Sequence, residues 1–322
     1  MNETREDLPV RRQGPEIKEI LLLIVLSVSL FLSILFVPVA GFFLSALTPA
    51  PTALSIVRRE GAKAWIVPGC SAAVGSLILV LLGLPESIPY LLGLVAMGAV
   101  IGYGFRLGWS ASKIVGFSSL LVVGLAALLA LFAYIRTKGQ MVHLIEQDIR
   151  DVITAAMKQL SAGSSVETKE MEKGLLEMVS PLVRMMPGIF ISSMLMISWV
   201  NLLVCRRYCR GPAGGGQEQE RLCLWKSPEH LVWLVIAGGL MLLLPWSAFS
   251  LLGINLVLVM GTVYFFQGLA IVAFYFEKWR APLFVKGFVY AVFFLERIAS
   301  MAVAALGLFD VWFDFRRHNK QA

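Results

Sequence analysis

The sequence predicts an all-α, polytopic integral membrane protein with about nine transmembrane helices. Hydrophobic residues make up 58% of the 322 residues and charged residues only 15%, and the mean hydropathy is +0.78. This composition lies well outside that of soluble domains. Apolar stretches of about 20 residues, the length that a helix needs to cross a bilayer, recur along the chain. Lysine and arginine gather at their ends, as is typical of membrane topology.

The basic residues and the cysteines argue against two other classes of protein. A net charge of +7 would suggest nucleic-acid binding in a soluble chain, but here topology explains it, so we expect the lipid bilayer and no nucleic acid as a partner. The four cysteines are too few and too unevenly spaced for a disulfide framework. The apolar stretch 20–47 far exceeds the roughly 7 to 15 residues of a cleavable signal core, so we expect it to stay in the membrane.

The apolar stretches place the expected spans in chain order. They cover 17–36, 38–57, 64–83, 87–106, 111–135, 181–205, 229–247, 251–276 and 282–308. Residues 17–57 could form one long tilted helix or two helices that turn at Pro38. Two helices place the basic loops on one side, which favours this interpretation and a cytoplasmic N-terminus.

These spans divide the chain into five expected parts. They are a cytoplasmic tail (1–16), a six-helix membrane part (17–205) with an extramembrane insert (136–180), a cytoplasmic linker (206–228), a three-helix membrane part (229–308) and a charged aromatic tail (309–322). In the insert, apolar residues from Val142 to Leu160 recur every three or four positions. This pattern predicts an amphipathic helix at the membrane interface.

Signals for chemistry are weak. The stretch GYGFRLG at 102–108 superficially resembles a phosphate-binding loop, but no strand is expected before it. Gly98 and Gly102 instead have the spacing that lets helices approach closely. No serine, cysteine or histidine lies in a recognisable nucleophile motif, so we expect no enzyme.

A zinc site is available by spacing alone. Cys205 and Cys209 share a helix face, and Cys223 and His230 follow across the linker. Such spacings arise easily by chance, so we expect no metal and no cofactor.

Polar residues inside the expected spans are more informative. They are Asn201, Asn255, Thr262, Gln267, Glu296 and Arg297. Each would cost several kcal/mol if it faced lipid unpaired, so we expect them to face protein or water. Hydrogen bonds between helices would satisfy the amides. Adjacent Glu296 and Arg297 would point about 100° apart on a helix, so each needs its own partner.

Two prolines interrupt the second expected span, in TPAPTALSIVRREG at 48–61. They remove backbone donors within the membrane, and interrupted helices often border binding sites. We therefore predict a ligand pocket. It is bordered by Pro49, Pro51, Gly98, Gly102 and Tyr103.

The stretch GLFDVWFDFRR at 307–317 mixes charges with aromatic rings. One interpretation is an interfacial anchor, since such rings suit the headgroup region and arginines can snorkel. Asp310, however, has no basic residue within a helical turn and needs a partner. We predict that it binds a base or backbone amides at an end of the first six helices. The motif residues are Asp310, Trp312, Asp314, Arg316 and Arg317.

Three segments carry a resemblance to a known family. TPAPTALSIVRREG, FFQGLAIVAFYFEKWRAP at 265–282 and GLFDVWFDFRR resemble the YybS-like family of bacterial membrane proteins, a domain of unknown function (DUF2232). The resemblance covers nearly the whole chain and implies a multi-pass protein of the bacterial inner membrane. The first six helices are also similar to the S component of energy-coupling factor vitamin transporters, which implies a small-molecule ligand. The alanine-x3-alanine docking face of many S components is absent from 17–36, where only Ser29 and Ser33 have that spacing.

Three functional hypotheses follow. A transport-related protein that binds a small molecule predicts an enclosed cavity near Pro49 and Pro51. A non-catalytic scaffold or interaction protein of the cell envelope predicts a tightly filled bundle with an exposed apolar patch. A membrane-protein partner or a homo-oligomer would fit either hypothesis. A membrane enzyme, the third possibility, predicts acidic groups or histidines that converge in a cleft.

Overall fold

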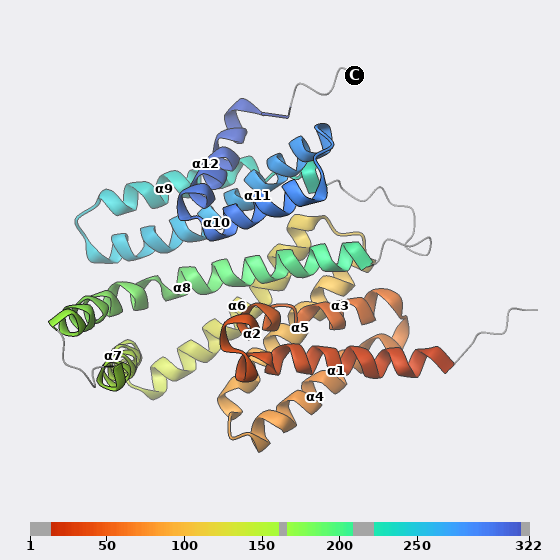
Figure 1. The fold of residues 1–322 in the computed structure, drawn as a ribbon, viewed down its shortest axis with the longest axis horizontal. Helices are drawn as coiled ribbons and strands as arrows, with labels where there is room; N and C mark the ends of the chain where they lie inside the picture. Colours follow the sequence, from red (N-terminus) through yellow and green to blue (C-terminus); the bar gives the residue numbers. More distant parts are fainter. Residues whose placement is uncertain (1–13, 161–165, 209–221, 317–322) are drawn as a thin grey trace, which may run out of the picture. The chain divides into compact units, whose positions relative to one another are not determined.

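The computed structural model describes residues 14–160, 166–208 and 222–316 (Figure 1). Every regular element in these ranges is a helix, and no strand occurs in them. The all-α fold class is therefore confirmed. The chain forms two compact units: unit 1 holds the described residues of 1–109, 113–121 and 197–215, and unit 2 holds those of 110–112, 122–196 and 216–322. The expected five-part division stays a prediction.

Unit 1 is built from the first five α-helices and parts of two longer ones. The elements are α1 (Gly14–Phe36), α2 (Pro38–Ser45), α3 (Pro49–Arg58), η1 (Gly61–Trp65), α4 (Ile66–Leu81), η2 (Pro85–Ser87) and α5 (Ile88–Arg106), with the start of α6 (Ala111–Arg136) and the end of α8 (Val166–Tyr208). The core gathers Phe31, Leu79, Leu91 and Leu94 from α1, α4 and α5. Helix α3 packs along α5 and is buried over most of its length.

Unit 2 contains the remaining elements. They are α7 (Met141–Leu160), η3 (Leu222–Leu224), η4 (Glu229–Leu231), α9 (Val232–Leu243), α10 (Ser247–Lys278), α11 (Leu283–Leu295) and α12 (Arg297–Phe313), with the rest of α6 and α8. Helix α10 packs against both α9 and α12 (Figure 1). It is the central helix of this group.

Seven helices in the described residues are long and apolar enough to cross a membrane, or eight if the bent pair α11–α12 is one span. The chain is therefore a multi-pass membrane protein that contacts the lipid bilayer. The apolar segment Glu229–Leu243 is shorter than a span. The last expected span, 282–308, is not one helix, because it breaks at Glu296 with a bend of 102°.

Of the two helices in the insert, α7 was predicted, whereas the early start of α8 was not. The amphipathic helix is present as α7, where Ile145, Ile149 and Ile153 are partly buried and Met157 is buried. Helix α8, by contrast, starts well before Pro181 and continues through Pro181 and Pro187 as 43 residues. At 1.5 Å per residue it is about 65 Å long, roughly twice the hydrocarbon thickness, so part of it extends beyond the membrane.

Candidate functional site

Two groups of buried polar side chains lie in or directly beside the apolar helices. The first, here called the break cluster, comprises Ser27, Thr48 and Asn201 in unit 1. The second, here called the C-terminal network, comprises Ser227, Gln267, Asp310 and Arg316 in unit 2. Buried polar groups at membrane depth are costly unless they are paired or have a function, so both groups are candidate sites.

The break cluster surrounds the interruption between α2 and α3. Pro49 and Pro51 have no N–H, so the carbonyls of Ser45 and Leu47 cannot accept regular helical bonds. They accept shorter-range bonds instead, from Thr48 N at 3.1 Å and Ala50 N at 3.0 Å. The chain therefore leaves one helix and starts the next with Pro49 at its first position, where proline is well tolerated.

Side chains from α1 and α8 bind the carbonyls of this interruption. Ser27 Oγ donates to Thr48 O at 3.3 Å, and Asn201 Nδ2 donates to Ala46 O and to Ile197 O, both at 2.7 Å. The two bonds from Nδ2 fix the orientation of the Asn201 amide. They leave Oδ1 as a buried acceptor.

Two buried oxygen atoms of the break cluster have no hydrogen-bond partner among the described residues. They are Asn201 Oδ1 and Thr48 Oγ1, and both residues are 0% exposed. A buried acceptor without a donor costs roughly 1–3 kcal/mol, so each such atom calls for an explanation. Water or a bound solute with a polar group would supply it.

Among the predicted pocket residues, Gly98 and Gly102 of α5 form a packed contact with α3. A Cβ atom on Gly98 would collide with Thr52 Oγ1 and Pro49 O, and one on Gly102 would lie 2.6 Å from Ala53 O. These two glycines therefore serve the close approach of α5 to α3 that their spacing indicated. Pro49 and Pro51 are buried and Tyr103 is exposed. The predicted pocket stays a prediction, and a ligand has no room where Gly98 and Gly102 contact α3.

Asp310 is the centre of the C-terminal network. Its Oδ2 accepts from Arg316 Nη2 at 2.6 Å and from Gln267 Nε2 at 3.0 Å, and its Oδ1 accepts from the N–H of Phe315 at 2.9 Å. Gln267 Oε1 in turn accepts from the hydroxyl of Ser227 at 2.5 Å. The carboxylate is buried, and these charge-assisted bonds compensate for its desolvation.

Arg316 extends the network to the segment before α9. Its Nη1 donates to the carbonyls of Cys223 and Trp225 at 3.0 and 2.9 Å. Arg316 reaches Asp310 because α12 ends at Phe313 and Asp314 adopts a left-handed conformation (φ 42°, ψ 63°), which turns the chain back. The network therefore joins α10, α12 and residues 223–227.

The prediction that the partner of Asp310 lies in the first six helices was wrong. Asp310 binds Arg316 of its own motif and Gln267 of α10, rather than a group of the first six helices. The prediction assumed that the helix continues past Asp310. On a continuing helix, a side chain six positions away, such as that of Arg316, does not contact Asp310. In the same motif Asp314 pairs with Lys226, Trp312 is exposed, and Arg317 lies outside the described residues.

Asn255 of α10 binds the backbone of α8 beside Pro187. Its Nδ2 donates to Arg184 O at 2.9 Å, and its Oδ1 accepts from Gly188 N at 2.5 Å. A Cβ on Gly188 would lie 2.7 Å from Asn255 Oδ1, so the contact requires glycine there. The side chain thus supports α8 where a proline weakens its hydrogen bonding.

The other polar residues within the expected spans have different surroundings. Thr262 bonds to its own helix, with Oγ1 donating to Leu258 O at 3.1 Å. Glu296 and Arg297 lie at the break between α11 and α12, and both are exposed. These two charges are therefore placed at a bend rather than inside a helix.

The cysteine and histidine residues within the described ranges do not gather into a metal site. Cys205 and Cys223 are buried, and Cys223 Sγ donates to Glu277 Oε2 at 3.4 Å. Cys209 lies outside the described residues. Within those ranges, no group of three or more histidine, cysteine or acidic residues has an arrangement suited to a metal ion.

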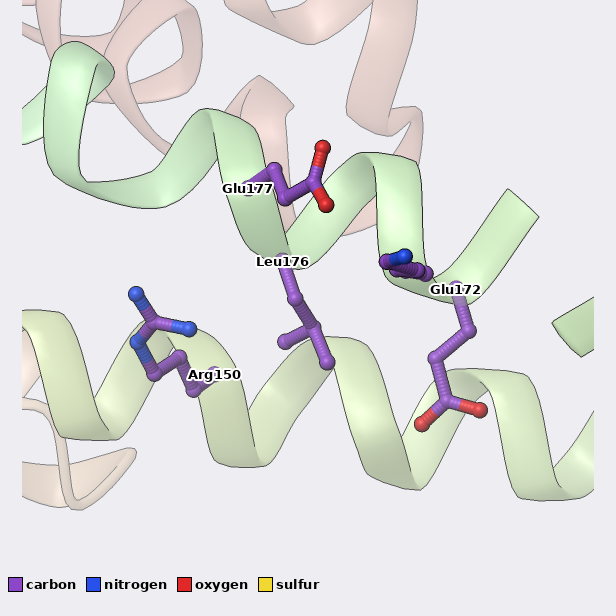
Figure 2. Close-up of a pocket in the computed structure, with 5 residues that line it drawn as sticks. Arg150, Glu172, Leu176 and Glu177 are labelled. Atoms are coloured by element: carbon purple, nitrogen blue, oxygen red, sulfur yellow. The ribbon is translucent and has the colours of Figure 1, made fainter. Parts of the chain in front are cut away.

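A shallow, open depression lies beside α7 and α8. It is lined by Arg150, Glu172, Lys173, Leu176 and Glu177. Leu176 points from α8 toward α7, and charged groups surround it (Figure 2). Its mixed charges and openness suit a solvated surface better than a small-molecule site.

A comparison with known protein families identifies the family of this chain. The family model described as predicted membrane protein (DUF2232) matches residues 25–311. The chain belongs to this family. Neither the curated proteins nor the solved structures contain a significant match. The likeness of this DUF2232 protein to S components therefore stays a prediction.

Sequence reasoning found the polar residues of the spans but missed several of their partners. Ser27, Thr48 and Ser227 were not singled out, although all three are buried with hydrogen-bonding groups. Thr48 begins the TPAP stretch, and its position beside Pro49 was the available signal. Small hydroxyl residues are common in membrane helices, so composition alone does not distinguish these three.

Proposed function

We propose that this DUF2232 protein binds a small polar molecule within the membrane and has a transport-related, non-enzymatic function in the bacterial inner membrane. The observation that supports this proposal most is the break cluster: an interrupted helix with two buried oxygen atoms, Asn201 Oδ1 and Thr48 Oγ1, that have no partner in the described part of the chain. Interrupted helices with free polar groups are the usual setting of substrate sites in transporters. The predicted likeness to S components points in the same direction.

A thermal-shift screen of the purified full-length protein in detergent tests this proposal. The panel comprises vitamins, nucleosides and amino acids. A ligand at 100 times its Kd stabilises the folded state by about 2.7 kcal/mol. We expect at least one compound to raise the melting temperature of the wild type, and to lose that effect in Asn201→Ala and Thr48→Val.

Thr262→Val is the matched control, because Thr262 Oγ1 donates to Leu258 O of its own helix. It should respond to the compound as the wild type does. A compound that stabilises the wild type and both break-cluster variants equally would place the site elsewhere. No response to any compound would contradict binding of these three classes.

A second candidate function is a scaffold or interaction protein of the cell envelope, with a membrane-protein partner or a second copy of the chain. The exposed apolar side chains of α7 favour it: Val142 is 53% exposed and Val152 is 69% exposed. A photo-crosslinking residue at Val152 would capture the partner, whereas one at exposed Gln147 would not. Equal capture at both positions would argue against a specific surface.

A further inference from the structure

The pair α11–α12 is too short and too bent for an ordinary span. Helix α11 has 13 residues and α12 has 17, which at 1.5 Å per residue gives about 20 and 26 Å. A hydrocarbon core is about 30 Å thick. The two helices meet at 102°, so the pair does not run straight from one face to the other.

The start of α11 lies at the C-terminal end of α10. Helix α10 ends at Lys278 and α11 begins at Leu283. From there α11 runs back along α10: Tyr290 packs edge-to-face with Phe276 and Phe294 with Phe265, each with ring centroids 5.6 Å apart. Helix α11 is therefore antiparallel to α10.

Asp310 of α12 binds Gln267 in α10, and the residues that follow α12 then reach the last turns of α10. Tyr275 lies three residues before the end of α10, and its hydroxyl donates to Phe315 O at 3.0 Å. Arg316 binds the carbonyl of Cys223, and Cys223 Sγ donates to Glu277. The start of α11 and residues 315–316, which follow α12, thus adjoin one cluster, formed by the end of α10 and the segment before α9.

The side chain of Ser300 binds the backbone at the break between α11 and α12. Ser300 Oγ lies 2.6 Å from Phe293 O and 3.0 Å from Glu296 O, on the two sides of the bend. Irregular backbone at membrane depth persists only where protein or water satisfies it. Charged side chains there likewise require water or a partner, and both Glu296 and Arg297 are exposed.

We propose that α11 and α12 form a re-entrant hairpin, which enters and leaves the membrane on the face that holds residues 222–227. Its tip carries Glu296 and Arg297 into a water-accessible site within the membrane. Lys278, Arg280, Lys286 and Arg316 then all lie near one face, which the positive-inside rule assigns to the cytoplasm. This inference concerns the path of the chain and does not depend on the proposed binding of a small molecule.

Cysteine labelling of the full-length protein in membrane vesicles tests the hairpin. In a variant without native cysteines, single cysteines replace Arg280, before α11, and Gln321, after α12. A membrane-impermeant maleimide is applied to sealed inside-out and right-side-out vesicles. We expect both positions to react from the same face. Reaction from opposite faces would show that the pair crosses the membrane and would overturn the proposal.

The tip is tested in the same background by Ile298→Cys, because Ile298 directly follows Glu296 and Arg297 at the break. A small charged methanethiosulfonate reagent should modify this position, since a thiol in lipid does not ionise and reacts slowly. Leu128→Cys is the control, because Leu128 is an exposed apolar residue on α6, and it should not react. If Ile298→Cys is as unreactive as this control, the water-accessible tip is wrong even where both ends share a face.

Discussion

Asp310 and Arg316 form a buried ion pair, with Oδ2 and Nη2 2.6 Å apart and the two side chains 0% and 4% exposed. The pair is six residues apart in the sequence and meets because the chain reverses at Asp314. Asp310 Oδ2 also accepts from Gln267 of α10, and Arg316 Nη1 donates to the carbonyls of Cys223 and Trp225. A local reversal thereby fixes the end of α12 to two other segments.

Asp310→Asn should destabilise the protein by about 3–5 kcal/mol, because it leaves the buried Arg316 guanidinium without its counter-charge. Thermal unfolding in detergent measures this loss. Asp314→Asn is the matched control: Asp314 pairs with Lys226, whose side chain is 45% exposed, and such pairs contribute about 0–1 kcal/mol. Equal, negligible losses in both variants would reduce the motif to an interfacial anchor.

Gly307→Ala should cost about 1–3 kcal/mol or more, because its Cβ would collide with Tyr264 O of α10. Gly261 lies on α10, and a Cβ at this position would meet no atom within 4 Å. Gly261→Ala should therefore be neutral or stabilising by up to about 1 kcal/mol. The two unfolding temperatures decide the matter, and a loss at Gly261 as large as at Gly307 would argue against the α10–α12 contact.

Asn255→Leu should lower stability by about 1–3 kcal/mol, because it removes the partners of Gly188 N and Arg184 O on α8. Amide hydrogen exchange should accelerate around residues 184–188 and not near Met194. Unchanged exchange at 184–188 would mean that the amide does not support the helix beside Pro187.

The apolar stretches made most of the fold predictable, because span length and the positions of basic residues depend on composition over long windows. The break at Glu296 was not predictable in this way, since FFLERIAS contains neither proline nor glycine. Conversely, the sixth span was expected to begin at Pro181, yet α8 continues through this residue. Beside Pro187, Asn255 of α10 binds the backbone of Gly188 and Arg184.

The sequence predicted which polar residues belong to the candidate sites, but not which residues they bind. Asn201, Gln267 and Asp310 were identified because polar groups in apolar helices need partners. Their partners depend on chain reversals and on contacts between distant segments, such as Gln267 with Ser227. A helical wheel cannot supply these contacts, because it assumes that the helix continues.

A double-mutant cycle on Asp310 and Arg316 tests most directly whether this pair holds the end of α12 in place. The free energies of unfolding of Asp310→Asn, Arg316→Gln and the double variant are compared with the wild type. Residues in one buried network couple by about 0.5–3 kcal/mol. We predict a coupling of at least about 1 kcal/mol, so that the double variant loses less than the sum of the single losses. Strict additivity would contradict the pair as a single stabilising unit.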